Sequence, residues 1–180
     1  MRYAGIDRCD ICNGNDVGVS VYVQGCHFHC KGCFNKETWD FNGGREWTDE
    51  VESKFIKLIS RPYIKRLTIL GGEPLAEQNL PLTHRLLQIA TDIILTQKKQ
   101  MKIWLYTGYT FEDITSYKSP NYSPTRAKAV ILSDYIVDGR FEIDKQDLTY
   151  SVVKYAGSTN QRIIDVQKSI EEERTVLWEG

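Results

Sequence analysis

The chain has 180 residues, of which 41% are hydrophobic and 26% charged, and its net charge is -1. These values predict a single globular domain over residues 1–180 and exclude a bulk charge that would attract nucleic acid or an acidic membrane, so we expect neither as a partner. The sequence has no apolar run of about 18 residues that could span a bilayer and no apolar signal segment at its start. We therefore expect a cytoplasmic location.

The first motif along the chain is a cysteine pair, Cys9 and Cys12, at C-x2-C spacing. The chain holds five cysteines, an odd number that argues against a closed disulfide framework and favours a reducing compartment where thiolates bind metal. A pair at this spacing can ligate zinc or iron. Because no other candidate ligand lies beside it in the sequence, we interpret both residues as small packed side chains without a metal. A four-thiolate zinc site that adds Cys30 and Cys33 is the alternative.

A predicted strand over residues 17–23 leads directly into three further cysteines. Valines alternate with other residues along this stretch, as expected for a strand with one buried face. Cys26, Cys30 and Cys33 follow at C-x3-C-x2-C spacing. Thiolates on so short a loop can converge on one iron–sulfur cluster, which usually takes four cysteines. Three would leave one iron without a protein ligand, and an open position marks catalytic rather than structural metal sites.

A second candidate site follows the next predicted strand. Thr48 is predicted to cap a helix, and an apolar run at residues 67–70 then indicates a buried strand. This strand ends at Gly71-Gly72-Glu73-Pro74. Two glycines let the backbone approach a ligand closely, and the Glu73 carboxylate can accept hydrogen bonds from an ammonium group. Alone this sequence could be an ordinary turn, but its place one strand–helix unit after the cysteine loop favours a ligand site.

The rest of the chain repeats the alternation of strand, loop and helix. Apolar residues at helical spacing predict a helix over residues 82–94, and strands are predicted at 103–106 and 135–137 with a Thr110-capped helix between them. Four or more such units predict an α/β fold with a parallel sheet and right-handed crossovers. A closed (β/α)8 barrel takes about 250 residues. The shorter chain therefore predicts an incomplete, laterally open barrel with the cysteine loop at the carboxyl edge of its strands.

Together these motifs resemble those of the radical S-adenosylmethionine (SAM) enzymes, and among them the activating proteins of anaerobic ribonucleoside-triphosphate reductase, which activate a glycyl radical enzyme. The cysteine loop alone would indicate only the superfamily, whereas the combination of stretches indicates this family and covers nearly the whole chain. The stretches are Asp10-Ile11 with Asn13-Gly14, Val23-Gln24-Gly25-Cys26 through Cys30, Cys33-Phe34-Asn35, Thr38-Trp39, Gly71-Gly72-Glu73-Pro74-Leu75, Tyr106-Thr107-Gly108-Tyr109, Val137-Asp138-Gly139-Arg140-Phe141 and Gly157-Ser158-Thr159-Asn160-Gln161.

The resemblance implies the cofactors, the reaction and the fold, which would be an incomplete barrel of the radical SAM type. Cys26, Cys30 and Cys33 would hold a [4Fe–4S] cluster whose open iron binds SAM. One electron from a flavodoxin-like or other low-potential donor would cleave SAM, and the resulting radical would take a hydrogen atom from a glycine of the reductase. The implied SAM contacts are Gly32, Cys33 and Phe34 beside the cluster and Gly71, Gly72 and Glu73 at the amino group.

Two other functions stay open at the level of sequence. A radical SAM enzyme acting directly on a small molecule would need additional substrate-binding polar groups inside the barrel. A structural zinc module would show neither iron–sulfur absorbance nor SAM cleavage. An incomplete barrel favours the activase, because a radical reachable from one side must be covered. The simplest cover is a partner protein that inserts a loop carrying a glycine, whose backbone can approach closely.

Overall fold

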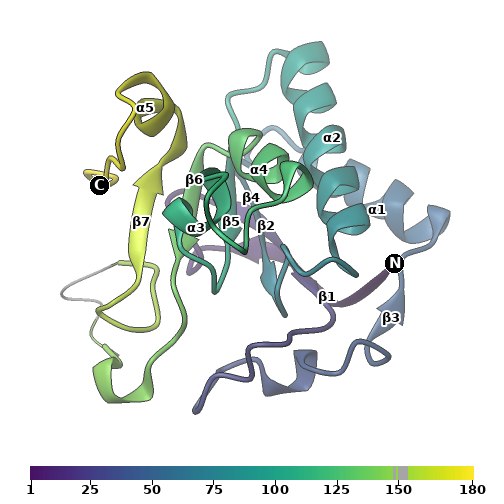
Figure 1. Cartoon of the computed structure of the whole chain (residues 1–180). Coiled ribbons are helices and arrows are strands. Elements are labelled where there is room, and N and C mark those ends of the chain that lie inside the picture. The colour runs from purple at the N-terminus through teal and green to yellow at the C-terminus, as the bar shows by residue number, and fades with distance from the viewer. Residues whose placement is uncertain (148, 150–153) are drawn as a thin grey trace.

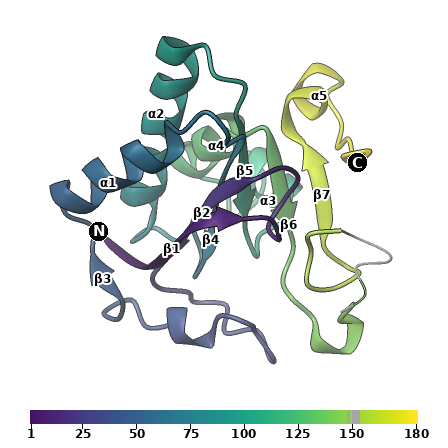
Figure 2. The ribbon, with the colours of Figure 1, turned by 180° about the vertical axis from the view of Figure 1, so that it is seen from behind.

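The computed structural model of the chain describes residues 1–147, 149 and 154–180, and its strands form one seven-stranded sheet (Figures 1 and 2). The strand order is β3-β1-β2-β4-β5-β6-β7. The strands are β1 Arg2–Asp10, β2 Gly18–Val23, β3 Arg45–Glu46, β4 Arg66–Gly71, β5 Lys102–Tyr106, β6 Tyr135–Asp138 and β7 Arg162–Asp165. The helices are α1 Asp49–Ile59, α2 Leu80–Gln97, α3 Phe111–Thr115, α4 Pro124–Ile131 and α5 Val166–Glu171, with 3-10 turns η1 Lys36–Thr38 and η2 Ile143–Lys145.

The sheet is parallel in its middle and antiparallel at its edges. Strands β2, β4, β5 and β6 run parallel, whereas β1 pairs antiparallel with β2 and β3, and β7 pairs antiparallel with β6. The α/β class is confirmed, and the sheet does not close on itself. The expectation of a parallel sheet holds for the four central strands and is wrong at both edges. Antiparallel neighbours need no helical crossover. The alternation of strands and helices along the sequence, which predicts the parallel strands, therefore gives no indication of the antiparallel ones.

One face of the sheet is covered by helices and holds most of the apolar core. The alternation of side chains along each strand sends every second residue to this face, and these residues share one buried cluster with the apolar sides of α1, α2 and α4. The predicted caps of two helices are present: Thr48 Oγ1 accepts a hydrogen bond from Val51 N, and Thr110 Oγ1 from Asp113 N. The strand residues of this face are Val19, Val21, Val23, Leu67, Ile69, Ile103, Leu105 and Ile136.

The opposite face, which we call the inner face, carries polar and aromatic side chains. Its members include Ser20, Tyr22, Arg66, Thr68, Leu70, Trp104, Tyr106, Tyr135 and Val137, which alternate with the residues of the helix-covered face. They lie in layers, because Ser20 is in register with Thr68 and Tyr22 with Leu70. Trp104 packs against Tyr135, Tyr155 and Trp178, so aromatic rings fill part of the space that a closed barrel would enclose.

A buried ion pair fills another part of the inner face. Arg66 is fully buried and donates to Asp10 Oδ2 at 2.8 Å and to the Asp10 carbonyl at 2.9 Å. Its Nη1 also reaches the carbonyl oxygens of Gly14, Asn15 and Asp16. Burial alone would raise the pKa of Asp10, but hydrogen bonds from Ser20 and the Cys12 backbone, together with the Arg66 charge, hold it below its ordinary value. Residues 11–16, which we call the plug loop, are thereby drawn onto the inner face.

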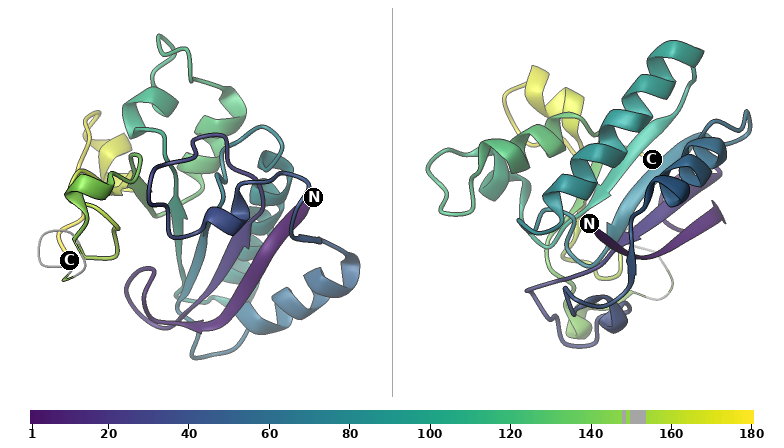
Figure 3. Two further views of the ribbon diagram at one scale, coloured as in Figure 1. Left: turned by 90° about the horizontal axis from the view of Figure 1, so that it is seen from below. Right: turned by 90° about the vertical axis from the view of Figure 1, so that its right-hand side faces the viewer.

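The carboxyl ends of the four parallel strands meet at one edge of the sheet. In Figure 1 the loop that follows β2 and the turn η2 that follows β6 both lie below the sheet, and the left view of Figure 3 looks onto this edge. In open α/β sheets this edge is where ligands bind. No helix within the described part of the chain has the length and apolar character needed to cross a membrane.

Removing one member of the Asp10–Arg66 pair should destabilise the fold strongly. In an Arg66→Leu variant Asp10 keeps its charge in a buried setting without its partner, a change that typically costs about 3–5 kcal/mol. The free energy of unfolding from urea titration measures this loss. Lys54→Ala is the control, because it breaks a pair with Glu50 whose side chains are 67% and 77% exposed and should leave stability near wild type. A small loss with Arg66→Leu, equal to that of the control, would contradict the role of the pair.

Candidate functional site

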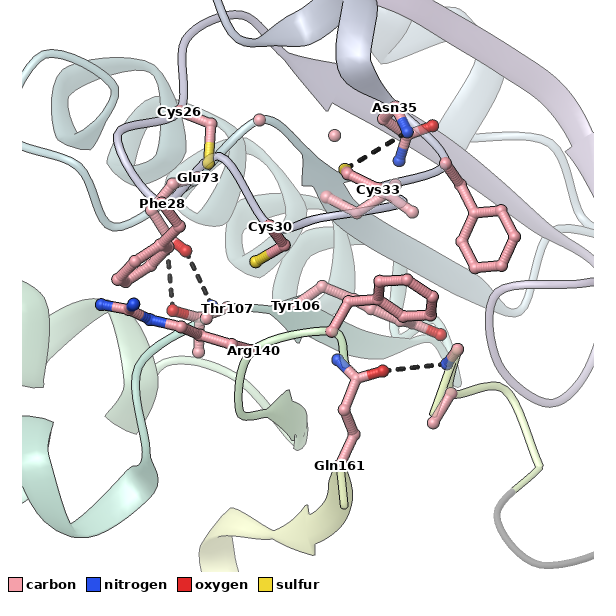
Figure 4. A pocket seen from close by; sticks show the side chains of 18 of the residues that line it. Cys26, Phe28, Cys30, Cys33, Asn35, Glu73, Tyr106, Thr107, Arg140 and Gln161 are labelled. Carbon is pink, nitrogen blue, oxygen red and sulfur yellow. Dashed lines mark hydrogen bonds between the residues drawn. The ribbon is translucent and has the colours of Figure 1, made fainter. Parts of the chain in front are cut away.

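A cavity of about 410 Å³ lies at the carboxyl edge of the sheet. Its walls come from the segments that follow β2, β4, β5 and β6, and from the plug loop. Figure 4 shows Cys26, Cys30 and Cys33 along one loop, with Tyr106, Thr107 and Glu73 among the residues that line the same space. The volume lies within the range of small-molecule and cofactor sites, which is about 300–1,000 Å³.

The three cysteines of the C-x3-C-x2-C loop all line this cavity. Each is half-buried and free, and Cys33 Sγ accepts a hydrogen bond of 3.4 Å from the backbone N–H of Asn35. The loop is anchored at its start, where Gly25 N donates to Thr38 O and Cys26 N to Trp39 O. A short loop held in this way can turn three side chains toward one space.

These thiols fit the requirements of an iron–sulfur cluster. Burial raises the pKa of Cys26, with a smaller contribution from the nearby Glu73 charge, and burial also raises the pKa of Cys30. Because thiolates are the ligands, cluster binding there would release protons. Among the residues that the structure describes, no three Cys, His, Asp or Glu side chains are grouped to hold a single metal ion. A cubane does not require such a group, because each thiolate binds a different iron.

The segment Gly71-Gly72-Glu73 packs directly against the start of the cysteine loop. Gly72 N donates to Val23 O at 2.9 Å and Glu73 N to Gly25 O at 2.8 Å. A Cβ atom on Gly72 would stand 2.2 Å from Gly25 O, so no larger residue fits there without a backbone shift. The predicted close backbone approach at these glycines is therefore present, but it is made first to the cysteine loop. All three residues line the cavity.

The carboxylate of Glu73 is buried and hydrogen-bonded within the protein. Only 1% of the residue is exposed. Oε1 accepts from Leu75 N at 2.8 Å and from Thr107 Oγ1 at 2.9 Å, and Oε2 accepts from Gly108 N at 2.8 Å. Glu73 thus joins the turn after β4 to the turn after β5. Burial raises its pKa to about 7, although the three hydrogen bonds oppose the shift. Ionised carboxylates accept about four hydrogen bonds, so one acceptor position is left for a ligand.

Of the implied SAM contacts on the cysteine loop, Phe34 lines the cavity and Gly32 does not. Phe34 lines it, is 57% exposed, and packs on Phe141 with ring centroids 5.0 Å apart. Gly32 is not among the lining residues and lies against Ile143, at φ 79°. The aromatic contact connects the loop after β2 with the segment after β6, although two strands, β4 and β5, lie between β2 and β6 in the sheet.

The expectation that Cys9 and Cys12 are packed side chains is wrong, because both are exposed. Cys9 lies in β1, and Cys12, in the plug loop, lines the cavity. The four-thiolate zinc site with Cys30 and Cys33 is not formed among the described residues. The interpretation of this pair as residues without a metal stays a prediction.

Several lining residues were not assigned a role from the sequence. Thr107 and Gly108 hold Glu73, and Arg140 stacks over the Phe28 ring at 4.4 Å. Their position in the sequence indicates such a role, because these residues directly follow predicted strands and therefore lie at the same edge as the cysteine loop. Asn13 and Tyr22 also line the cavity, and nothing in their local sequence indicates it.

The raised pKa of Glu73 predicts how the stability of the iron-free protein depends on pH. Because the pKa is raised from about 4.5 to about 7 on folding, stabilisation by this group is complete below pH 4.5 and is lost as the pH rises through 7. The loss is on the order of 3 kcal/mol. Urea titrations between pH 5 and 8 should show a flatter profile for Glu73→Gln than for wild type. Glu77→Gln, an exposed neighbour on the same loop, should keep the wild-type profile, and an unchanged profile in Glu73→Gln would refute the assignment.

Comparison with known proteins identifies the family of the chain. Residues 12–164 match the family described as a 4Fe-4S single cluster domain. Relatives from several organisms bear the name anaerobic ribonucleoside-triphosphate reductase-activating protein. The one from Enterobacteria phage T4 is 32% identical over 91% of this chain and 93% of its own length. Those from Salmonella typhi and Escherichia coli K12 are 33% and 32% identical over 89% of this chain and 96% of theirs. The chain belongs to the family of anaerobic ribonucleoside-triphosphate reductase-activating proteins.

Proposed function

We propose that this protein is a radical SAM activase that generates a glycyl radical on an anaerobic ribonucleoside-triphosphate reductase. The observation that carries the proposal is the meeting of the C-x3-C-x2-C loop and the Gly71-Gly72-Glu73 turn in one cavity at the carboxyl edge of an open α/β sheet. Family membership supports the same target. We interpret the open sheet with its inner face as an incomplete barrel of the radical SAM type.

Cys26, Cys30 and Cys33 are the proposed ligands of a [4Fe–4S] cluster. They are half-buried and line one cavity, and the family match includes all three positions. Because the protein supplies three thiolates for four irons, one iron has no protein ligand and can bind another molecule. The free thiols and the cytoplasmic location we propose are consistent with each other, because a reducing compartment keeps such thiols available.

SAM is proposed to bind beside the cluster, with its amino group near Gly71, Gly72 and Glu73. Glu73 has one acceptor position left after its three protein donors. A nearby cation lowers the pKa of a carboxyl group, so SAM binding would hold Glu73 ionised. Cys33 and Phe34 line the same cavity and are the proposed contacts on the cluster side, with Gly32 supporting their loop.

When bound, the cluster and SAM supply the radical chemistry: one-electron cleavage of SAM and removal of a hydrogen atom from a glycine of the reductase. The contribution of the protein is binding, orientation and exclusion of side reactions. The turn after β4 and the turn after β5 are held together through Glu73, which keeps the walls of the cavity in place. A flavodoxin-like or other low-potential protein is the proposed electron donor.

Iron binding should depend on three cysteines and not on the other two. After anaerobic reconstitution the wild-type protein should hold about four irons per chain, and Ala at position 26, 30 or 33 should abolish the cluster because two thiolates do not retain a cubane. Iron analysis with the absorbance spectrum measures this. Cys9→Ala and Cys12→Ala are the matched controls and should keep their iron. Loss of iron from Cys9→Ala would show that the ligand assignment is wrong.

The proposed reaction should appear as a glycyl radical on the partner. Reduced protein, SAM and the cognate reductase, mixed without oxygen, should give the doublet of a glycyl radical in an electron paramagnetic resonance spectrum. Mixtures with Cys26→Ala, Cys30→Ala or Cys33→Ala should give none. SAM cleavage by the wild-type protein with no signal on the reductase would instead favour direct action on a small molecule.

A further inference from the structure

The floor of the cavity carries a hydroxyl group whose hydrogen is not used within the described residues. Tyr22 lies on the inner face, lines the cavity and is half-buried. Its hydroxyl oxygen accepts a hydrogen bond of 3.2 Å from Asn13 Nδ2, and it donates no hydrogen bond to a described residue. The hydroxyl of Tyr106, on the same floor, differs because it donates to Tyr155 O at 2.6 Å. Burial raises the pKa of Tyr22, so this hydroxyl stays protonated and remains a donor.

The orientation of Asn13 is determined by its neighbours. Asn13 Nδ2 donates to Asp10 Oδ2 at 3.0 Å as well as to Tyr22. An ionised carboxylate only accepts, so the amide nitrogen must face Asp10 and the carbonyl oxygen Oδ1 must point elsewhere. The backbone of Asn13 is held by Thr68 Oγ1, which donates to its carbonyl at 2.9 Å. Asn13 also lines the cavity, and its Oδ1 accepts no hydrogen bond from a described residue.

The two groups are neutral, adjacent and of opposite hydrogen-bonding type. The Asp10 charge beneath them is compensated by Arg66 at 2.8 Å, so the floor does not attract a cation or repel an anion strongly. A donor and an acceptor side by side match the N–H and C=O of one residue in extended backbone, because each residue of a chain offers one N–H and one C=O. Tyr22 belongs to strand β2 and Asn13 to the plug loop, whereas the cysteine loop and Gly72 lie beyond the ends of β2 and β4.

We infer that Tyr22 and Asn13 form a binding subsite for the peptide backbone of the partner beside its reacting glycine. The Tyr22 hydroxyl donates to a backbone carbonyl of the partner, and Asn13 Oδ1 accepts from a backbone N–H. A glycine segment suits this floor, because it brings its backbone close without a side chain in the way. The inference rests on the proposed function and assigns to it two positioning residues outside the cluster and SAM contacts.

The test is Tyr22→Phe, which removes the donor and keeps the ring. Loss of one neutral hydrogen bond made equally in the ground and transition states should raise the KM for the cognate reductase about three- to tenfold and leave kcat unchanged. Iron content, the dissociation constant for SAM, reductive SAM cleavage without the reductase, and the melting temperature should stay at wild-type values. Tyr63→Phe is the matched control, because Tyr63 is 53% exposed and its hydroxyl contacts Arg61 away from the cavity.

The outcomes separate this inference from the proposed function. An unchanged KM in Tyr22→Phe, with a glycyl radical formed by the wild type, overturns the subsite and leaves the function standing. Weaker SAM binding in the variant also overturns it, because Tyr22 would then contact the cofactor. A wild-type protein that holds its cluster and cleaves SAM but yields no glycyl radical overturns both. A raised KM that appears equally in Tyr63→Phe would show a general effect on docking and refute the subsite.

Discussion

The buried pair of Asp10 and Arg66 determines what the inner face of this open sheet can hold. A sheet that does not close on itself would leave polar strand residues exposed to water on that face. Arg66 Nη1 instead gathers the carbonyl oxygens of Gly14, Asn15 and Asp16, and Nη2 pairs with Asp10, in a setting where an unpaired charge would be costly. The plug loop is drawn onto the inner face as a result, and the cavity lies beside it at the carboxyl edge. The same pair orients Asn13 through Asp10.

Side chains at the strand ends, rather than the loops alone, give this edge its shape. Gln24, just past β2, donates to Asp40 O at 2.7 Å, and Glu73, past β4, accepts from Thr107 and Gly108. Asp138, at the end of β6, accepts from Phe111 N at 2.8 Å. Gln161 accepts from Gly157 N and donates to Gly139 O, both at 2.9 Å. Each of these bonds connects segments that neighbour one another in space, so the cavity walls are supported by the sheet.

Local patterns in the sequence predicted the elements that local physics determines. The valine alternation before the cysteines and the capping residues Thr48 and Thr110 gave a strand and two helix starts that are present. Strand β1 was not predicted, because several of its residues are exposed and its apolar positions do not alternate. The contacts of Glu73 with Thr107 and of Arg66 with Asp10 span 34 and 56 residues. No pattern in a single sequence indicates such long-range pairs. The connection that Glu73 makes between the turns after β4 and β5, and the position of the plug loop, are therefore visible only in the structure.

Glu73 connects the packing of the edge with its chemistry. Two of its three donors are backbone N–H groups, which can only donate and so cannot accept a hydrogen bond from a protonated carboxyl group. Only the Thr107 hydroxyl can rotate to become an acceptor. The surrounding bonds therefore suit the ionised carboxylate, while burial favours the neutral acid and raises the pKa to about 7. A cationic ligand arriving at the remaining acceptor position would favour the ionised form and so strengthen the bonds to Leu75, Thr107 and Gly108. Binding of a cation there would then tighten the turns after β4 and β5, because the carboxylate that accepts from both turns would also be the charge that such a ligand meets.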